Sequence, residues 1–276
     1  MTAWKLLGIT CIVAPLTASA SIFFTDFESD AVGATTAAGE VDGFFANRAG
    51  GVVRDSSSVA PFGPENQYLE FSGANSRAIV SAATVSDFAG ALVEVSIDFF
   101  DAGSGTGGFG TRFGLGTGEF ADTPDLNASG SLFSIRFRTS DQTVNIDANT
   151  SLVSGSVGGY SVETAYRVQY IFNLTSEDQA VSTLDGNSVS LEPMQAAFGM
   201  QDLATGDFSN IAVLASSGTV NNHIGLVFRN FSTDETIAYY DNLSVIPEPT
   251  TYAAIFGLAA LALLLVRRRL SGRAVR

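Results

Sequence analysis

Short alternating runs of apolar and polar residues fill the chain between residues 21 and 246, and Gly, Asn, Asp and Ser separate them. The clearest run is Leu92–Asp101, where side chains of successive residues point to opposite faces of an extended strand. One face carries Val93, Val95, Ile97 and Phe99, and the other carries Glu94, Ser96 and Asp98. The period of two predicts β-strands rather than helices.

The same pattern predicts about a dozen more strands. They are Ser21–Glu28, Gln67–Phe71, Ser76–Ser81, Thr111–Gly116, Ser131–Thr139, Thr143–Asp147, Tyr166–Asn173, Val181–Leu184, Ser188–Leu191, Ile211–Ala215, His223–Phe231 and Thr236–Ile246. Asp185-Gly186-Asn187 predicts a hairpin turn, because such residues tolerate a positive φ. Pro193–Ala197 is expected to form the one short helical turn. Even spacing without a βαβ rhythm predicts an all-β fold, a single antiparallel β-sandwich.

Both ends of the chain read as targeting segments. Residues 1–20 are typical of a secretory signal peptide, with Lys5 before the apolar run Leu6–Leu16 and Ala18-Ser19-Ala20 as the cleavage pattern. The single cysteine, Cys11, lies inside this peptide, so the exported part has no disulfide.

The C-terminal segment, residues 246–276, contains Pro247-Glu248-Pro249, an apolar run over residues 250–266, and Arg267-Arg268-Arg269. Seventeen helical residues span about 25 Å, slightly less than the about 30 Å of a bilayer core. The three arginines place the C-terminus in the cytoplasm by the positive-inside rule. A transmembrane helix with residues 21–245 outside is therefore expected, preceded by an extended, accessible proline segment.

This order of motifs resembles the PEP-CTERM sorting signal of Gram-negative, biofilm-forming bacteria. The resemblance implies that an exosortase, a membrane cysteine protease, recognises Pro247, Glu248 and Pro249 and processes the chain. It also implies a transient membrane anchor and then a place at the cell surface or in the extracellular matrix. An ordinary C-terminal anchor is the alternative.

The net charge of the exported part limits which classes of partner it can bind. Residues 21–246 contain eight arginines, no lysine and 27 acidic residues, a net charge of −19. Such a surface repels nucleic acid, which requires a cationic face. It suits divalent cations or a hydrated matrix of exopolysaccharide.

A second resemblance concerns the body of the chain. Tyr166–Phe172 followed by Val181–Gly186, and the closing run Tyr239–Val245, are similar to strands of laminin-G and concanavalin-A-like jelly rolls, the fold of many lectins and glucanases. Galactose-binding-like jelly rolls share the ending. This resemblance implies carbohydrate binding.

One candidate cofactor is a structural Ca²⁺. Asp26, Glu28 and Asp30 alternate, so a strand reaching that far would hold three carboxylates on one face, where a hard cation would relieve their repulsion. In carbohydrate-binding jelly rolls a calcium joins the first strand to an aspartate of the last, which implies Asp26, Glu28 and Asp241 as ligands here. The alternative is a solvated acidic edge that prevents strand aggregation.

A catalytic site is the rival hypothesis. Retaining glucanases of this fold carry Glu-x-Asp-x-x-Glu or Glu-x-Asp-x-Glu on one strand. Here Glu94 matches the first acid, Ser96 replaces the middle Asp, and Asp98 replaces the last Glu. Both departures undermine that chemistry. Tyr160, Tyr239 and Tyr240 are candidates for stacking on sugar rings. The sequence thus predicts a non-catalytic structural or carbohydrate-binding matrix protein, with a glycan hydrolase as the alternative.

Overall fold

The computed structural model describes residues 23–36, 40–41, 44–45, 50–72, 77–80, 90–104, 111–117, 131–146, 149–218, 224–230 and 237–248. These residues form strands and turns, as predicted, and the predicted signal peptide and the apolar C-terminal run lie outside them. No helix within the described part has the length and apolar character needed to cross a membrane.

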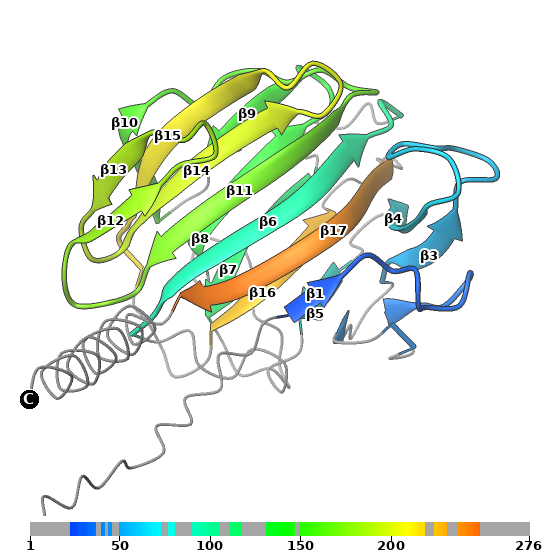
Figure 1. Ribbon diagram of the computed structural model, residues 1–276, viewed down its shortest axis with the longest axis horizontal. Helices are drawn as coiled ribbons and strands as arrows, with labels where there is room; N and C mark the ends of the chain where they lie inside the picture. The colour runs from blue at the N-terminus through cyan, green and yellow to red at the C-terminus, as the bar shows by residue number, and fades with distance from the viewer. Residues whose placement is uncertain are drawn as a thin grey trace, which may run out of the picture.

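The larger sheet has nine antiparallel strands in the order β10-β15-β14-β11-β6-β17-β4-β3, with β1 pairing beside β17 (Figure 1). Its strands are β1 (Phe23–Thr25), β3 (Val52–Asp55), β4 (Gln67–Ser72), β6 (Leu92–Asp101), β10 (Thr150–Gly155), β11 (Ala165–Asn173), β14 (Gln195–Asp202), β15 (Phe208–Ser216) and β17 (Ile237–Glu248). The long strands β6, β11 and β17 are neighbours in its middle.

The smaller sheet lies behind the larger one in Figure 1 and has six strands in the order β2-β5-β16-β7-β8-β9. They are β2 (Phe44–Phe45), β5 (Arg77–Val80), β7 (Thr111–Thr117), β8 (Ser131–Arg138), β9 (Thr143–Ile146) and β16 (Ile224–Asn230). A separate hairpin consists of β12 (Gln179–Ser182) and β13 (Ser188–Leu191). Its turn has Gly186 at a φ of 81°, as the Asp-Gly-Asn sequence predicts.

Aromatic side chains fill the space between the two sheets. Phe99 of β6 meets Phe137 of β8 with ring centroids 4.4 Å apart, and Phe133 of β8 meets Phe172 of β11 at 5.0 Å. Tyr160, Tyr239 and Tyr240 are buried, so the prediction that they stack on sugars is wrong.

Two other predictions need correction. Residues 195–197 belong to β14 rather than to a helical turn, because pairing with β11 and β15 outweighs their local helix preference. The first strand ends at Thr25, and Phe27 follows with a φ of 59° and a fully buried ring. Asp26, Glu28 and Asp30 therefore do not alternate along a strand.

Candidate functional site

The outer face of the larger sheet carries polar side chains in register across its central strands. Residues directly opposite in antiparallel strands share a face. One row contains Asp241 of β17, Asp98 of β6 and Arg167 of β11, and the next contains Ser244, Ser96 and Gln169 of the same strands. The inner-facing neighbours of these residues form the core, so the alternation seen in the sequence creates a polar outer face.

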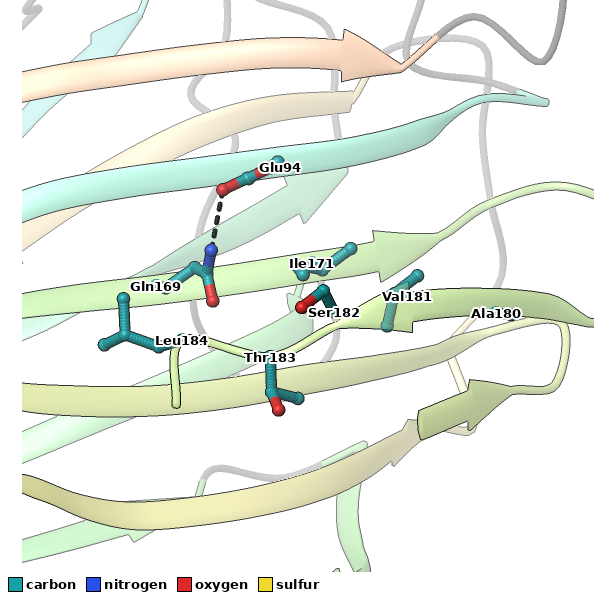
Figure 2. A pocket seen from close by; sticks show the side chains of 8 residues that line it. All are labelled: Glu94, Gln169, Ile171, Ala180, Val181, Ser182, Thr183 and Leu184. Carbon is teal, nitrogen blue, oxygen red and sulfur yellow. Dashed lines mark hydrogen bonds between the residues drawn. The ribbon is translucent and has the colours of Figure 1, made fainter. Parts of the chain in front are cut away.

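The hairpin β12–β13 packs against part of this face. Val181 and Leu191 of the hairpin form a second small apolar cluster with Leu92, Ile171 and Ala197 of the sheet. Beside this contact lies a groove of about 420 Å³, which we call the hairpin groove (Figure 2). Its lining comprises Glu94, Gln169, Ile171, Ala180, Val181, Ser182, Thr183 and Leu184.

Polar groups from both sides face the hairpin groove. On the sheet side, Gln169 Nε2 donates a hydrogen bond of 2.6 Å to Glu94 Oε1 (Figure 2). On the hairpin side, Thr183 N donates a hydrogen bond to Asn187 O. Because hydrogen-bonded and non-hydrogen-bonded pairs alternate along antiparallel strands, the backbone N–H and C=O groups of Ala180 and Ser182 point away from β13. A carboxylate, an amide and a strand edge thus converge, which is a donor and acceptor set suited to a ligand rich in hydroxyl groups.

An exposed aromatic ring extends this surface. Phe24 of β1 is 56 % exposed and lies opposite Ser244 of β17. Ser244 in turn lies opposite Ser96 of β6, and Ser96 lies opposite Gln169 of β11. Three strand spacings of about 4.8 Å separate Phe24 from Gln169, a span of about 14 Å. Small serines therefore form a floor between an apolar ring and the polar edge of the hairpin groove.

Two buried carboxylates, those of Asp98 and Asp241, lie beside these serines, where β17 has a bulge. The register of β17 with β6 shifts between Asp241 and Ser244, and Asn242 has a φ of 48°. Asp241 Oδ2 accepts a hydrogen bond of 2.6 Å from Asn66 Nδ2, and Asp241 Oδ1 accepts one of 2.7 Å from Asn242 N. The bulge lies where the outer neighbour of β17 changes from β4 to β1.

The pKa of Asp241 is raised to about 6. Burial is the main cause and the charges of Asp98 and Asp26 add to it, against hydrogen bonds from Asn66 and Asn242 that lower the pKa. The charged form of this carboxyl is therefore disfavoured in the folded protein. A bound cation would stabilise it.

The predicted calcium ligands are placed near one another only in part. Asp26 Oδ1 accepts from Glu28 N at 3.2 Å, and Glu28 Oε1 accepts from Gln67 N at 2.7 Å. Gln67 follows Asn66, the residue that contacts Asp241. The described residues contain no group of three or more His, Cys, Asp or Glu side chains arranged to hold a metal ion. The charge of Asp26 acts on Asp241, but the ligand set of Asp26, Glu28 and Asp241 stays a prediction.

Glu94, Ser96 and Asp98 face outward, as predicted, and each acid has its own partner. Glu94 accepts from Gln169, and Asp98 accepts two hydrogen bonds from Arg167. Four residues of strand separate the two acids by about 13 Å. A retaining glycosidase needs carboxyls about 5 Å apart, which this pair does not provide.

The start of the sorting segment is part of the sheet. Pro247 and Glu248 belong to β17 and lie opposite Val93 and Leu92 of β6. The segment is extended, as predicted, but it is paired along one edge instead of standing clear of the domain. Pro249 and Arg267, Arg268 and Arg269 lie outside the described residues.

Several solved structures match the chain at low identity, among them two lectins. The basic winged bean lectin with Tn-antigen has a TM-score of 0.49 and 10% identity, covering 82% of this chain and 99% of that one. The Ca²⁺/Man2-bound exoplasmic/lumenal domain of VIP36 has a TM-score of 0.45 and 6% identity, covering 83% and 88%. Lectin I-B4 of Griffonia simplicifolia, in its metal-free form, has a TM-score of 0.39 and 11% identity, covering 82% and 92%. All three TM-scores are below 0.5, so these likenesses carry no argument about this chain.

No curated protein matches the chain. The family model of the PEP-CTERM protein-sorting motif matches residues 245–269, in agreement with the predicted sorting segment. The chain therefore carries a PEP-CTERM protein-sorting motif.

Proposed function

We propose that the protein is exported, processed by an exosortase and placed at the cell surface or in the matrix, where its sandwich binds carbohydrate without catalysing a reaction. The observation that supports binding most directly is the hairpin groove. There Glu94 and Gln169 face the free edge of β12, and Phe24 stands at the far end of the same sheet face.

The chemistry of this surface suits a neutral or weakly charged glycan. Sugar hydroxyls donate to carboxylates and accept from amides and backbone N–H groups, and all three are available in the hairpin groove. The apolar face of a pyranose ring covers an exposed phenyl ring such as Phe24. Asp98 lies too far from Glu94 to serve as the second carboxyl of a retaining mechanism, and this favours binding over hydrolysis.

A structural Ca²⁺ near Asp241, with Asp26 and Glu28, is retained as part of this proposal. Its support is the raised pKa of Asp241, to which the charge of Asp26 contributes. Calcium would supply positive charge to carboxylates that burial disfavours. Within this scheme the ion supports the fold and takes no part in a reaction.

A glycan array tests the proposal. The full chain, purified in detergent, is compared with Glu94→Ala/Gln169→Ala and with Phe24→Ala, and Phe208→Ala is the control because Phe208 is also exposed, at 45 %. We expect one class of glycans to bind the parent protein and the control, with at least about 10-fold weaker binding by the groove variants. Binding that is the same in all four proteins would refute the groove as the site. Release of reducing sugar by the parent protein would instead establish the hydrolase.

A further inference from the structure

Four arginines occupy one row across the smaller sheet. Arg77 of β5 lies opposite Arg229 of β16, Arg229 lies opposite Arg112 of β7, and Arg112 lies opposite Arg136 of β8. Directly opposed residues share a face of the sheet. The residues on either side of Arg136 in β8 are buried in the core, so the row is on the face turned away from the core.

The row contrasts with the charge of the rest of the exported part. Residues 21–246 hold only eight arginines among 27 acidic residues, yet the six strands of the smaller sheet contain five arginines and no aspartate or glutamate. The fifth, Arg138, is on the same face and forms an ion pair of 2.9 Å with Asp141. Basic residues are therefore concentrated on one sheet of an acidic domain.

Like charges in direct cross-strand register destabilise a sheet. In Arg136 the positive charge is also poorly compensated, because its Nε has no contact with solvent and no hydrogen-bond partner among the described residues. A guanidinium is a planar fork that binds carboxylate or sulfate groups through two hydrogen bonds. An anionic ligand on this face would offset the repulsion between the arginines.

The shape of the row selects among anions. Neighbouring strands are about 4.8 Å apart, so the four positions form a narrow line about 14 Å long. A linear polymer with regularly spaced negative groups can follow such a line. A membrane is a plane, and its anionic surface would also meet the surrounding acidic residues, which repel it.

We propose that the outer face of the six-stranded sheet binds an acidic polysaccharide, whose carboxylate or sulfate groups contact Arg77, Arg229, Arg112 and Arg136. This site is on the opposite sheet from the hairpin groove and does not depend on it. The protein then has two separate glycan contacts, one selecting hydroxyl groups and one selecting negative charge.

Binding of polygalacturonate, a linear polyuronate, tests the site, with neutral dextran as the reference polymer. The full chain, purified in detergent, is compared with Arg112→Gln/Arg136→Gln. The matched control is Arg54→Gln, which removes an exposed arginine that pairs with Glu70 on the larger sheet. We expect the double variant to bind polygalacturonate at least about 10-fold more weakly and with a shallower salt dependence, because fewer counterions are displaced. The control should stay within about 2-fold.

A third variant, Arg112→Lys/Arg136→Lys, separates loss of charge from loss of fold, since it keeps the positive charge and should retain part of the affinity. Equal binding of dextran and polygalacturonate by the parent protein would overturn the proposal, and so would unchanged affinity in the glutamine variant. A glutamine variant that loses binding to phosphatidylglycerol vesicles but keeps polygalacturonate binding would assign the row to a membrane surface instead. Failure of the groove variants in the glycan array leaves this experiment unaffected.

Discussion

Arg167 of β11 and Asp98 of β6 lie directly opposite each other and form a two-pronged ion pair. Arg167 Nε is 2.8 Å from Asp98 Oδ1, and Arg167 Nη2 is 3.0 Å from Asp98 Oδ2. Asn242 adds a third hydrogen bond of 2.9 Å to the same carboxylate. Asp98 is 2 % exposed, so its charge is stabilised almost entirely by these partners.

Removing Arg167 should therefore destabilise the sandwich strongly. Arg167→Ala leaves the Asp98 carboxylate buried without its counter-charge, and we expect a loss of about 2–4 kcal/mol in the free energy of unfolding. Arg54→Ala, which breaks an exposed ion pair with Glu70, should cost no more than about 1 kcal/mol. Denaturant unfolding of both variants measures the difference, and equal losses would contradict the role given to burial.

The titration of Asp241 predicts a pH dependence of stability. Its pKa of about 6 in the folded protein lies above the value of about 3.9 for an unfolded chain. Between these two pKa values the folded state binds more protons, so this group lowers stability as the pH rises from about 4 to about 6. The loss should reach about 3 kcal/mol.

Asp241→Asn isolates that contribution, since an amide keeps the shape and does not titrate. In a chelator such as EDTA, the parent protein should lose stability relative to Asp241→Asn as the pH rises through this window. Unfolding curves at pH 4, 5, 6 and 7 give the difference at each pH. A difference that stays constant across the series would show that Asp241 titrates at its ordinary pKa.

Calcium should reverse the penalty. If the ion binds Asp241 with Asp26 and Glu28, adding Ca²⁺ at 100 times its dissociation constant raises stability by about 2.7 kcal/mol. Thermal melting with and without EDTA measures this change, with Asp241→Asn as the variant that should not respond. A parent melting temperature that is the same with Ca²⁺ and with EDTA would refute the calcium site.

Pro247→Ala/Glu248→Ala tests sorting separately from folding. Alanine restores an N–H group that proline lacks, so the pairing of β17 with β6 should survive the change. We expect the variant to fold with an unchanged melting temperature but to accumulate in the inner membrane. Cell fractionation and the mass of the mature chain decide the outcome, and normal release of the variant would argue against exosortase recognition at this motif.

The sequence predicted the all-β character and the inward and outward faces of β6, because alternation is a local property. It missed β3, β10 and β14, and it took Gln195–Ala197 at the start of β14 for part of a helical turn, where pairing with distant strands determines the conformation. The prediction for Asp26, Glu28 and Asp30 was wrong about their strand because Phe27 turns into the core with a positive φ.

The candidate sites also depend on contacts between distant parts of the chain, which a sequence alone does not show. Pro247, Glu248 and Pro249 are recognisable from neighbouring residues alone. Arg77, Arg112, Arg136 and Arg229 are spread over about 150 residues, and only the register of four strands reveals their common row. The hairpin groove is also non-local, since Glu94 and Ser182 meet only after β12 folds back over the sheet.

Val245 is both a core residue and the first residue matched by the sorting motif. Body and tail therefore share a strand instead of being joined by a spacer. A protease that cuts before Glu248 would remove the end of β17 and its pairing with Leu92 of β6, whereas a cut beyond Glu248 leaves the sheet whole. The exact end of the mature chain thus records whether the enzyme met a finished sandwich or one whose last strand was still open.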